Sequence, residues 1–276
     1  MLQRIFFFFI LSFFLFSCGE TQPKEKDATE KFAENANDQD FQDKHETPAQ
    51  LDFSPKGINL EIPTLDGKMA NAYLLTAKEE SKNYLFVIHE WWGLNDHIKK
   101  EAERLRDALP NTTVMALDLY DGKVATDPKQ AGEFMNAVST ERATTIIEGA
   151  MASVGKDAKV ATIGWCFGGG WSLKTSIMLG KQGAGCVIYY GMPVENAKDL
   201  VPLKADVLGI FAEKDGWITP EVVNKFDALT KATGKNFTFK QFEANHAFAN
   251  PSSPRYEEAA AQEANAMALD FLKKRL

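Results

Sequence analysis

The chain has 276 residues, a formal net charge of −7 and an ordinary balance of apolar and charged residues. Such a composition is typical of a soluble globular protein, and the length suits one large α/β domain with extensions. Because no cluster of Lys and Arg offsets the acidic balance, the sequence argues against nucleic acid or an anionic membrane surface as the main partner. We therefore expect a small-molecule or apolar substrate.

Residues 1–18, MLQRIFFFFILSFFLFSC, form a targeting segment rather than part of the fold. Arg4 precedes an apolar run, Ile5 to Phe16, that is shorter than the roughly 20 residues needed to span a bilayer. The ending LFSC resembles the signal of bacterial lipoproteins, which implies lipid attachment at Cys18. The alternative is an uncleaved membrane anchor. Both predict a place in the bacterial cell envelope, on the periplasmic face of the inner or outer membrane or at the cell surface, with no membrane contact beyond this anchor.

Residues 19–54 are dense in charged and amide side chains and poor in apolar ones. This composition predicts a disordered polar tether, in which His45 is solvated rather than a ligand. The folded domain is expected to cover residues 55–276.

Within that domain, a strand, a turn at Asp66-Gly67 and a second strand come first, as in a hairpin. Strands and helices then alternate, which predicts an α/β fold with a mostly parallel central sheet and helices on both faces. The expected strands are INLEIP, NAYLLTA, YLFVIH, TVMALDLY, KVATIGW, AGCVIYYG, DVLGIFA and FTFKQFE, and helical periodicity marks residues 96–109, 128–154, 169–180, 220–233 and 254–274.

The stretch VIHEWWGLNDH, residues 87–97, invites comparison with the His-Glu-x-x-His motif of zinc proteases. That motif needs two histidines one turn apart on a helix. Here Gly93 occupies the fifth position, and the preceding apolar run is of strand type. We therefore expect no metal site in this stretch, and we expect His89 to be a packed residue at a strand end.

The most specific motif is IGWCFGGG, residues 163–170, which follows a predicted strand and opens a predicted helix. It matches Gly-x-Ser-x-Gly with Cys166 in place of serine, a turn that presents a nucleophile at the edge of the sheet. The N-terminus of the following helix would favour an exposed, reactive thiolate. The alternative is an inert buried cysteine in a glycine-rich turn.

Two further residues follow in the chain order typical of such hydrolases, nucleophile, then acid, then histidine. Asp215 comes directly after the strand DVLGIFA, and His246 comes directly after FTFKQFE. Either could by itself be a loop residue. With Cys166, at the ends of three strands, they predict a catalytic triad with a thiol nucleophile.

Residues 55–276 resemble the dienelactone hydrolase family of the α/β-hydrolase fold, through the motifs HEWWGLNDH, DLYDG, GWCFGGG, AEKDGWITP and NHAFAN. The resemblance implies that Cys166 is the nucleophile, that His246 is the general base and acid, and that Asp215 orients the imidazole. It also implies that Glu90 contacts the resting cysteine. The backbone N–H groups of Trp91 and Phe167 would form the oxyanion hole.

The motifs also suggest side chains that contact the substrate. Trp91 and Trp92 could line the rim of an apolar site or simply belong to the core. In family members that act on carboxylated lactones, an arginine lies where this chain has Asn250, so we expect no strong preference for a carboxylated substrate. Arg255 and Lys123 are alternative anion partners. The full set of candidate substrate-binding residues is Trp91, Trp92, Tyr120, Lys123, Trp217, Phe248 and Asn250.

These observations predict a monomeric hydrolase that cleaves an ester or lactone through a thioester, without metal or cofactor. Cys186 should be a core thiol, because it lies about four residues before the carboxyl end of its strand and too far from Cys166 for a disulfide. Two alternatives stay open. One is a catalytically silent binding protein, and the other is a thiol redox protein, although the chain has no Cys-x-x-Cys pair.

Overall fold

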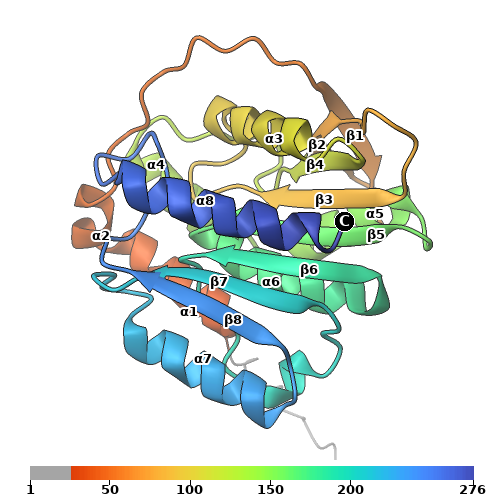
Figure 1. The fold of residues 1–276 in the computed structure, drawn as a ribbon. Coiled ribbons are helices and arrows are strands. Elements are labelled where there is room, and N and C mark those ends of the chain that lie inside the picture. The colour runs from red at the N-terminus through yellow and green to blue at the C-terminus, as the bar shows by residue number, and fades with distance from the viewer. Residues whose placement is uncertain (1–25) are drawn as a thin grey trace, which may run out of the picture.

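A computed structural model of the chain describes residues 26–276. The predicted targeting segment and Cys18 lie outside the described residues. An eight-stranded sheet forms the centre, in the order β1-β2-β4-β3-β5-β6-β7-β8 (Figure 1). The strands are β1 (Ile58–Pro63), β2 (Met69–Leu75), β3 (Asn83–Ile88), β4 (Thr112–Leu117), β5 (Lys159–Trp165), β6 (Gly183–Tyr189), β7 (Asp206–Ala212) and β8 (Phe237–Phe242).

The sheet is mostly parallel, as predicted. Strands β1 and β2 form the expected antiparallel hairpin, β2 pairs antiparallel with β4, and the other neighbours are parallel. The central strands are near-continuous apolar runs because both of their faces are covered. This arrangement matches the predicted α/β-hydrolase fold.

Six helices of the domain follow the predicted order: α3 (Asp96–Ala108), α4 (Pro128–Ala137), α5 (Thr140–Val154), α6 (Phe167–Leu179), α7 (Pro220–Ala232) and α8 (Glu258–Lys273). The single helix predicted over 128–154 is wrong, since α4 ends before Val138 and Ser139 caps α5 through the Arg142 N–H. A serine at this position competes for backbone donors and so begins a new helix. Three short 3₁₀ turns complete the described elements: η1 (Asn35–Asn37), η2 (Gly180–Gln182) and η3 (Ala197–Leu200).

Helices cover both faces of the sheet. On β6, a Cβ added to Gly185 would meet Phe271 of α8, whereas the next residue, Cys186, contacts Ser172 of α6. Successive strand residues point to opposite faces, so α8 and α6 lie on opposite sides. Figure 1 shows α8 in front of the sheet and α6 behind it.

The N-terminal segment, residues 26–54, differs from the predicted disordered tether. Its first part forms two helices, α1 (Ala28–Glu34) and α2 (Gln39–Asp43), with η1 between them. Phe32 and Phe41 are almost fully buried, and the Asp27 carboxylate accepts a 2.6 Å hydrogen bond from Lys174 of α6. The prediction failed because a few apolar side chains, too sparse to form a core of their own, pack onto a preformed domain.

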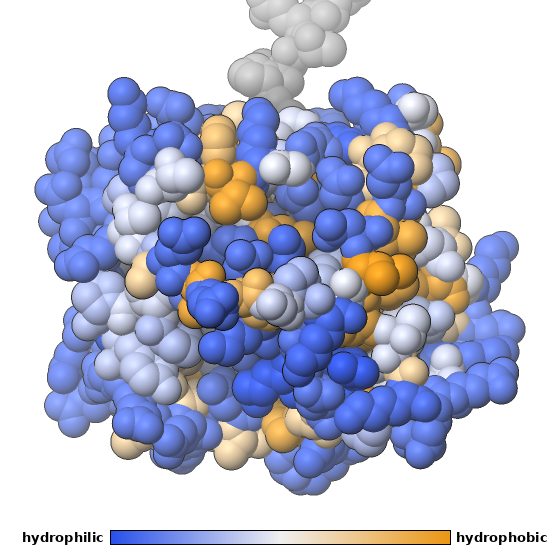
Figure 2. Space-filling model, turned by 90° about the horizontal axis from the view of Figure 1, so that it is seen from above, coloured by the Kyte–Doolittle hydropathy of each residue, from blue (hydrophilic) through white to orange (hydrophobic). Residues whose placement is uncertain are grey.

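Among residues 26–276, no helix has the length and apolar character needed to cross a membrane. The face seen in Figure 2 is mostly hydrophilic and carries only separate apolar patches. Most of the large apolar side chains of the domain belong to the buried core.

Candidate active site

Cys166 sits on a tight turn between β5 and α6. Its backbone is left-handed, with φ of 54°, although it is not glycine. A Cβ at Gly164 would lie 2.0 Å from the Gly168 carbonyl oxygen, and a Cβ at Gly168 would lie 2.3 Å from that of Ile88. The glycines therefore permit the close approach that the turn requires, and the surrounding strands hold a strained backbone in place.

His246 and Asp215 meet beside this turn, as the sequence predicted. Nδ1 of His246 lies 2.6 Å from one carboxylate oxygen of Asp215, and both side chains are buried. The other oxygen of Asp215 accepts hydrogen bonds from the backbone N–H groups of Trp217, at 2.9 Å, and Ile218, at 3.0 Å. The carboxylate is thus fixed, and it orients the imidazole so that Nε2 faces away from it.

These contacts set the protonation states. Burial by itself would lower the pKa of His246, but the negative charges of Asp215 and of the Cys166 sulfur outweigh it and raise that pKa to about 10. For Asp215, burial acts to raise the pKa, but the charge and hydrogen bond of His246 and the two N–H donors bring it below its usual value. At neutral pH the pair is therefore imidazolium and carboxylate.

Glu90 follows β3 and lines the same small cavity as Cys166. One carboxylate oxygen accepts a 2.5 Å hydrogen bond from the Asn250 side-chain amide. Burial raises the pKa of Glu90 to about 7, although the charge of His246 and the Asn250 bond act in the opposite direction. The Asn250 amide is therefore occupied by Glu90, and its oxygen accepts from Ser252.

The two expected oxyanion donors come from the segments that follow β5 and β3, which are neighbouring strands. Phe167 is the first residue of α6, a position whose N–H has no partner within the helix. Trp91 follows Glu90 beyond the end of β3, the strand that pairs with β5. His89 is packed, as predicted: it is fully buried, with Nδ1 2.6 Å from the Glu90 carbonyl and Nε2 accepting from the Leu119 N–H at 3.1 Å.

The cavity at Cys166 is small. Its volume is about 20 Å³, enough for roughly one water molecule, and Cys166 is only 2% exposed. The expected exposed thiol is therefore wrong for this conformation. The N-terminal segment covers it, since His45 and Glu46 belong to the lining, which also includes Glu90, Trp91, Trp92, Cys166, His246, Ala247, Asn250, Ser252, Ser253 and Pro254.

His45 is the residue that closes the site, which corrects the prediction of a solvated histidine. Its ring centre lies 4.6 Å from that of Trp91, 5.6 Å from that of Trp217 and 5.6 Å from that of His246. Phe41 packs beside it, with ring centres 4.7 Å from Trp217 and 5.2 Å from Trp91. Burial lowers the pKa of His45 to about 3, and the positive charge of His246 adds to that effect.

The other candidate substrate-binding residues are spread over three environments. Trp91 and Trp92 line the cavity but are buried. Tyr120 and Phe248 belong to the core and do not line it, and burial raises the pKa of Tyr120 well above its usual value. Lys123 is exposed, with its ammonium 5.4 Å from the centre of the Phe134 ring.

Arg255, one of the two alternative anion partners, lies before α8 and is half-buried. Burial lowers its pKa despite the negative charges of Asp215, Asp40 and Cys166. Cys186 is a buried free thiol, as predicted, and burial raises its pKa to about 11.

Sequence reasoning missed Phe41, His45 and Tyr190 as residues near the site. Tyr190 directly follows β6, with φ of 34° and a buried hydroxyl, and its ring centre is 5.0 Å from that of His246. A signal for α1 was present: Asp27 and Glu30 form a capping box, followed by Phe32 at helical spacing. Nothing in the sequence placed His45 against His246, because that contact depends on how the segment docks.

Comparisons with known proteins identify the family and the fold. The sequence matches the Dienelactone hydrolase family over residues 70–276. It is 28% identical over 224 residues to Protein usf of Aquifex pyrophilus, covering 76% of this chain and 96% of that protein. It is 26% identical over 228 residues to Carboxymethylenebutenolidase 1 of Cupriavidus pinatubonensis, covering 77% of this chain and 95% of that protein.

Among solved structures, a dienelactone hydrolase-like promiscuous phosphotriesterase from metagenomic libraries superposes with a TM-score of 0.64. The sequence identity is 20%, and the match covers 79% of this chain and 98% of that structure. This likeness supports the fold. The N-terminal segment lies outside the range matched by the family.

Proposed function

Since the chain belongs to the dienelactone hydrolase family and is an ester or lactone hydrolase, we propose that it acts through Cys166, His246 and Asp215. The observation that carries this proposal is the meeting of the three side chains. They follow β5, β7 and β8, yet form one buried cluster at the carboxyl ends of the parallel strands. Ligands bind at this edge in open α/β sheets.

The protonation states suggest how the reaction begins. With its pKa raised to about 10, His246 holds a proton at neutral pH, beside the sulfur of Cys166. The sulfur attacks the carbonyl carbon of the substrate, and the N–H groups of Trp91 and Phe167 stabilise the negative oxygen that develops. His246 then gives its proton to the departing alcohol oxygen, which leaves a thioester on Cys166.

The second half of the reaction uses the same residues in reverse. A water molecule attacks the thioester carbon, and Nε2 of His246 takes a proton from that water. The thioester collapses to the carboxylic acid, and the sulfur is released as the imidazolium forms again. Asp215 keeps the imidazole oriented throughout and stabilises its charge.

Glu90 has a supporting role in this proposal. A buried carboxyl with a pKa of about 7 changes its charge near neutral pH, within the cavity that holds the nucleophile. Its Asn250 partner fixes one oxygen of the carboxyl. We infer that Glu90 helps to hold the resting cysteine until a substrate arrives.

The two alternatives make different predictions. A binding protein would keep the pocket but have no need of the His246–Asp215 contact, which this chain has at 2.6 Å. A redox protein would need a resolving thiol. The other thiol in the described part of the chain, Cys186, faces Ser172 inside the fold, and its raised pKa keeps it protonated.

The test measures hydrolysis of activated esters and small lactones by the wild type, by Cys166→Ala and by the matched control Cys186→Ala. We expect Cys166→Ala to lose turnover while it keeps the wild-type circular dichroism spectrum. Cys186→Ala should retain turnover. Full turnover in Cys166→Ala would refute the mechanism. No turnover by the wild type, together with tight binding of a substrate analogue, would favour the binding protein.

For location, we propose lipid attachment at Cys18, on the strength of the LFSC sequence after an apolar run. Acyl chains would then hold the protein at a membrane in the cell envelope. Cys18→Ala should move the protein from the membrane fraction to the soluble fraction. Retention in the membrane after signal removal would contradict the proposal.

A further inference from the structure

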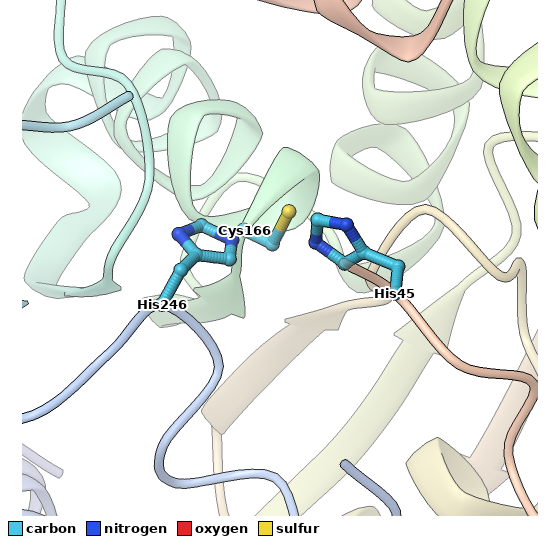
Figure 3. A group of neighbouring side chains, drawn as sticks. All are labelled: His45, Cys166 and His246. Atoms are coloured by element: carbon cyan, nitrogen blue, oxygen red, sulfur yellow. The ribbon is translucent and has the colours of Figure 1, made fainter. Parts of the chain in front are cut away.

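Three buried side chains from distant parts of the sequence meet at the closed active site. His45, Cys166 and His246 each offer one ligand atom, and these three atoms all lie within 4.8 Å of one another. Figure 3 shows the sulfur of Cys166 between the two imidazole rings. His45 comes from the N-terminal segment, whereas Cys166 and His246 come from the domain.

His45 presents an unprotonated nitrogen to this cluster. Its Nδ1 lies 2.6 Å from the Phe41 carbonyl oxygen, which can only accept, so Nδ1 carries the hydrogen. The remaining nitrogen, Nε2, is buried and has no hydrogen-bond partner in the described part of the chain. A buried nitrogen lone pair without a partner is costly, and it is also the form of imidazole that binds metals.

His246 presents its Nε2 to the same cluster. Its Nδ1 faces the Asp215 carboxylate at 2.6 Å, and its Nε2 is buried beside the Cys166 sulfur, where it would give up its proton when a metal binds. Histidines that bind metals usually donate the other ring N–H to a carboxylate or a backbone carbonyl. Both outer partners are therefore already in place, one of each kind.

We propose that His45, Cys166 and His246 bind a zinc ion when the N-terminal segment is docked. Two imidazole nitrogens and one thiolate suit Zn²⁺, which takes these ligands in a tetrahedral site. The three residues line one small cavity of about 20 Å³, and a water molecule would complete the four ligands. Zn–N and Zn–S bonds are roughly 2.0 to 2.3 Å long, so small side-chain rotations would bring the three ligand atoms close enough to share one ion.

The charges around the cluster favour a cation. Asp215 is ionised, and Glu90 lines the same cavity, while the half-buried Arg255 nearby opposes a cation. A divalent ion brings two positive charges, and its binding releases the proton held by His246. The net charge of the site therefore rises by one unit. The site also joins the segment to the domain through metal bonds.

Zinc binding and hydrolysis exclude each other, because both use the Cys166 sulfur and Nε2 of His246. A bound ion would also hold His45 over the cavity and so keep substrate out. The site would thus store the enzyme in a closed form that a chelating ligand or a low zinc concentration opens.

The test uses the purified full-length chain carrying Cys18→Ser, so that Cys166 and Cys186 are its thiols. Metal is removed by dialysis against a chelator, and the protein is titrated with ZnCl₂ or CoCl₂ alone. The variants are His45→Ala, Cys166→Ser and the control His97→Ala, which removes a hydrogen bond from His97 to Ala49 of the same segment and leaves all three proposed ligands. The readouts are metal affinity, the Co²⁺ absorption spectrum and proteolysis of the segment.

We expect one ion per chain, with the absorption of tetrahedral Co²⁺ and a thiolate-to-cobalt band that is lost in Cys166→Ser. His45→Ala should weaken zinc binding by more than the roughly 10- to 100-fold that loss of an outer-shell partner costs, and His97→Ala should change it little. Zinc should protect the segment from protease in the wild type but not in His45→Ala.

Equal zinc affinity in the wild type and His45→Ala would overturn the proposal, as would a Co²⁺ spectrum without the thiolate band. These readouts do not depend on turnover. A chain that binds zinc in this way but hydrolyses no ester would contradict the proposed function alone.

Discussion

The domain and the N-terminal segment are built on different physical principles, although both bury aromatic residues at the same site. In the domain, each site residue lies within four residues of the end of a parallel strand, so the sheet itself positions Cys166, Asp215 and His246. The segment has no strand in that sheet and is held by side chains, chiefly Phe32, Phe41 and His45, and by the Asp27–Lys174 ion pair.

The difference shows how the two regions divide the work. Elements with many shared backbone hydrogen bonds open only with the global fold, whereas a segment held by a few side chains opens at much lower free energy. The domain can therefore keep a rigid catalytic geometry while the segment controls access to it. The predictions below test that division, from the largest expected effect to the smallest.

The largest effect concerns the domain alone. His246→Ala and Asp215→Ala should each lower kcat by roughly 10⁴-fold or more, because members of a triad act as a unit. For the same reason the double variant should be little worse than His246→Ala. Turnover of an activated ester measures this. Losses that multiply in the double variant would show that the two residues serve separate steps.

A second effect belongs to the segment. Phe41→Ala removes a buried ring that packs on Trp91 and Trp217, a change that costs roughly 3 to 5 kcal/mol at a buried site. If the segment is docked for 90 to 99% of the time, release raises kcat/KM for small esters roughly 10- to 100-fold.

Gln39→Ala is the matched control, since Gln39 is exposed on the same helix. In Phe41→Ala, both the rate of turnover and the rate at which iodoacetamide alkylates Cys166 should rise. Cys186 should stay unreactive. Unchanged alkylation and turnover would mean that the segment does not limit access.

The third effect is the pH dependence with which the N-terminal segment docks on the domain. The pKa of His45 falls from its usual 6.5 to about 3 in the docked state. Because docking lowers the pKa of His45, protonation of this residue favours the undocked state. Docking is therefore strongest above pH 6.5 and weakens as the pH falls toward 3. At pH 5 the docking equilibrium should weaken by up to about 30-fold, tenfold for each pH unit below 6.5.

Limited proteolysis of the segment between pH 7.5 and pH 5 measures this, with His45→Gln as the non-titrating reference. Of the charged groups that act on His45, His246 and Arg255 keep their protons and Asp215 stays ionised over that range. Glu90, which lines the same cavity, changes its charge near pH 7, and the His45→Gln reference separates its effect from that of His45. Equal pH dependence in both proteins would remove His45 as its source.

The smallest effect concerns substrate choice. The Asn250 amide is engaged by Glu90, and an amide lacks the charge that binds a carboxylate strongly. We expect the wild type to prefer a carboxylated ester over its neutral methyl-ester counterpart by less than about 100-fold in kcat/KM, or some 2.7 kcal/mol. Asn250→Arg should raise that ratio by no more than about tenfold, because Glu90 would pair with the new arginine.

A larger preference of the wild type for the carboxylated ester would point to Arg255, which interacts electrostatically with Asp215 and Cys166. Arg255→Gln would then abolish it. Lys123 is a weaker candidate, since it is exposed and does not line the cavity.

Much of the domain followed from local sequence. The apolar runs KVATIGW and DVLGIFA became β5 and β7 with the predicted bounds, because buried parallel strands need continuous apolar residues. Cys166, Asp215 and His246 could be placed at one edge since each directly follows a strand. The helix boundary at Ser139 was missed because a short break in apolar periodicity is a weak signal.

The sequence by itself determined the family and the residue types that follow the predicted strands. Only the tertiary structure decided that Cys166 is covered and that His45 faces His246. The physical reason is the range of the interactions: a single strand or turn depends mostly on neighbours in the chain. The docking of residues 26–54 depends on a surface formed by Trp91, Trp217 and α6, which exists only after the domain has folded.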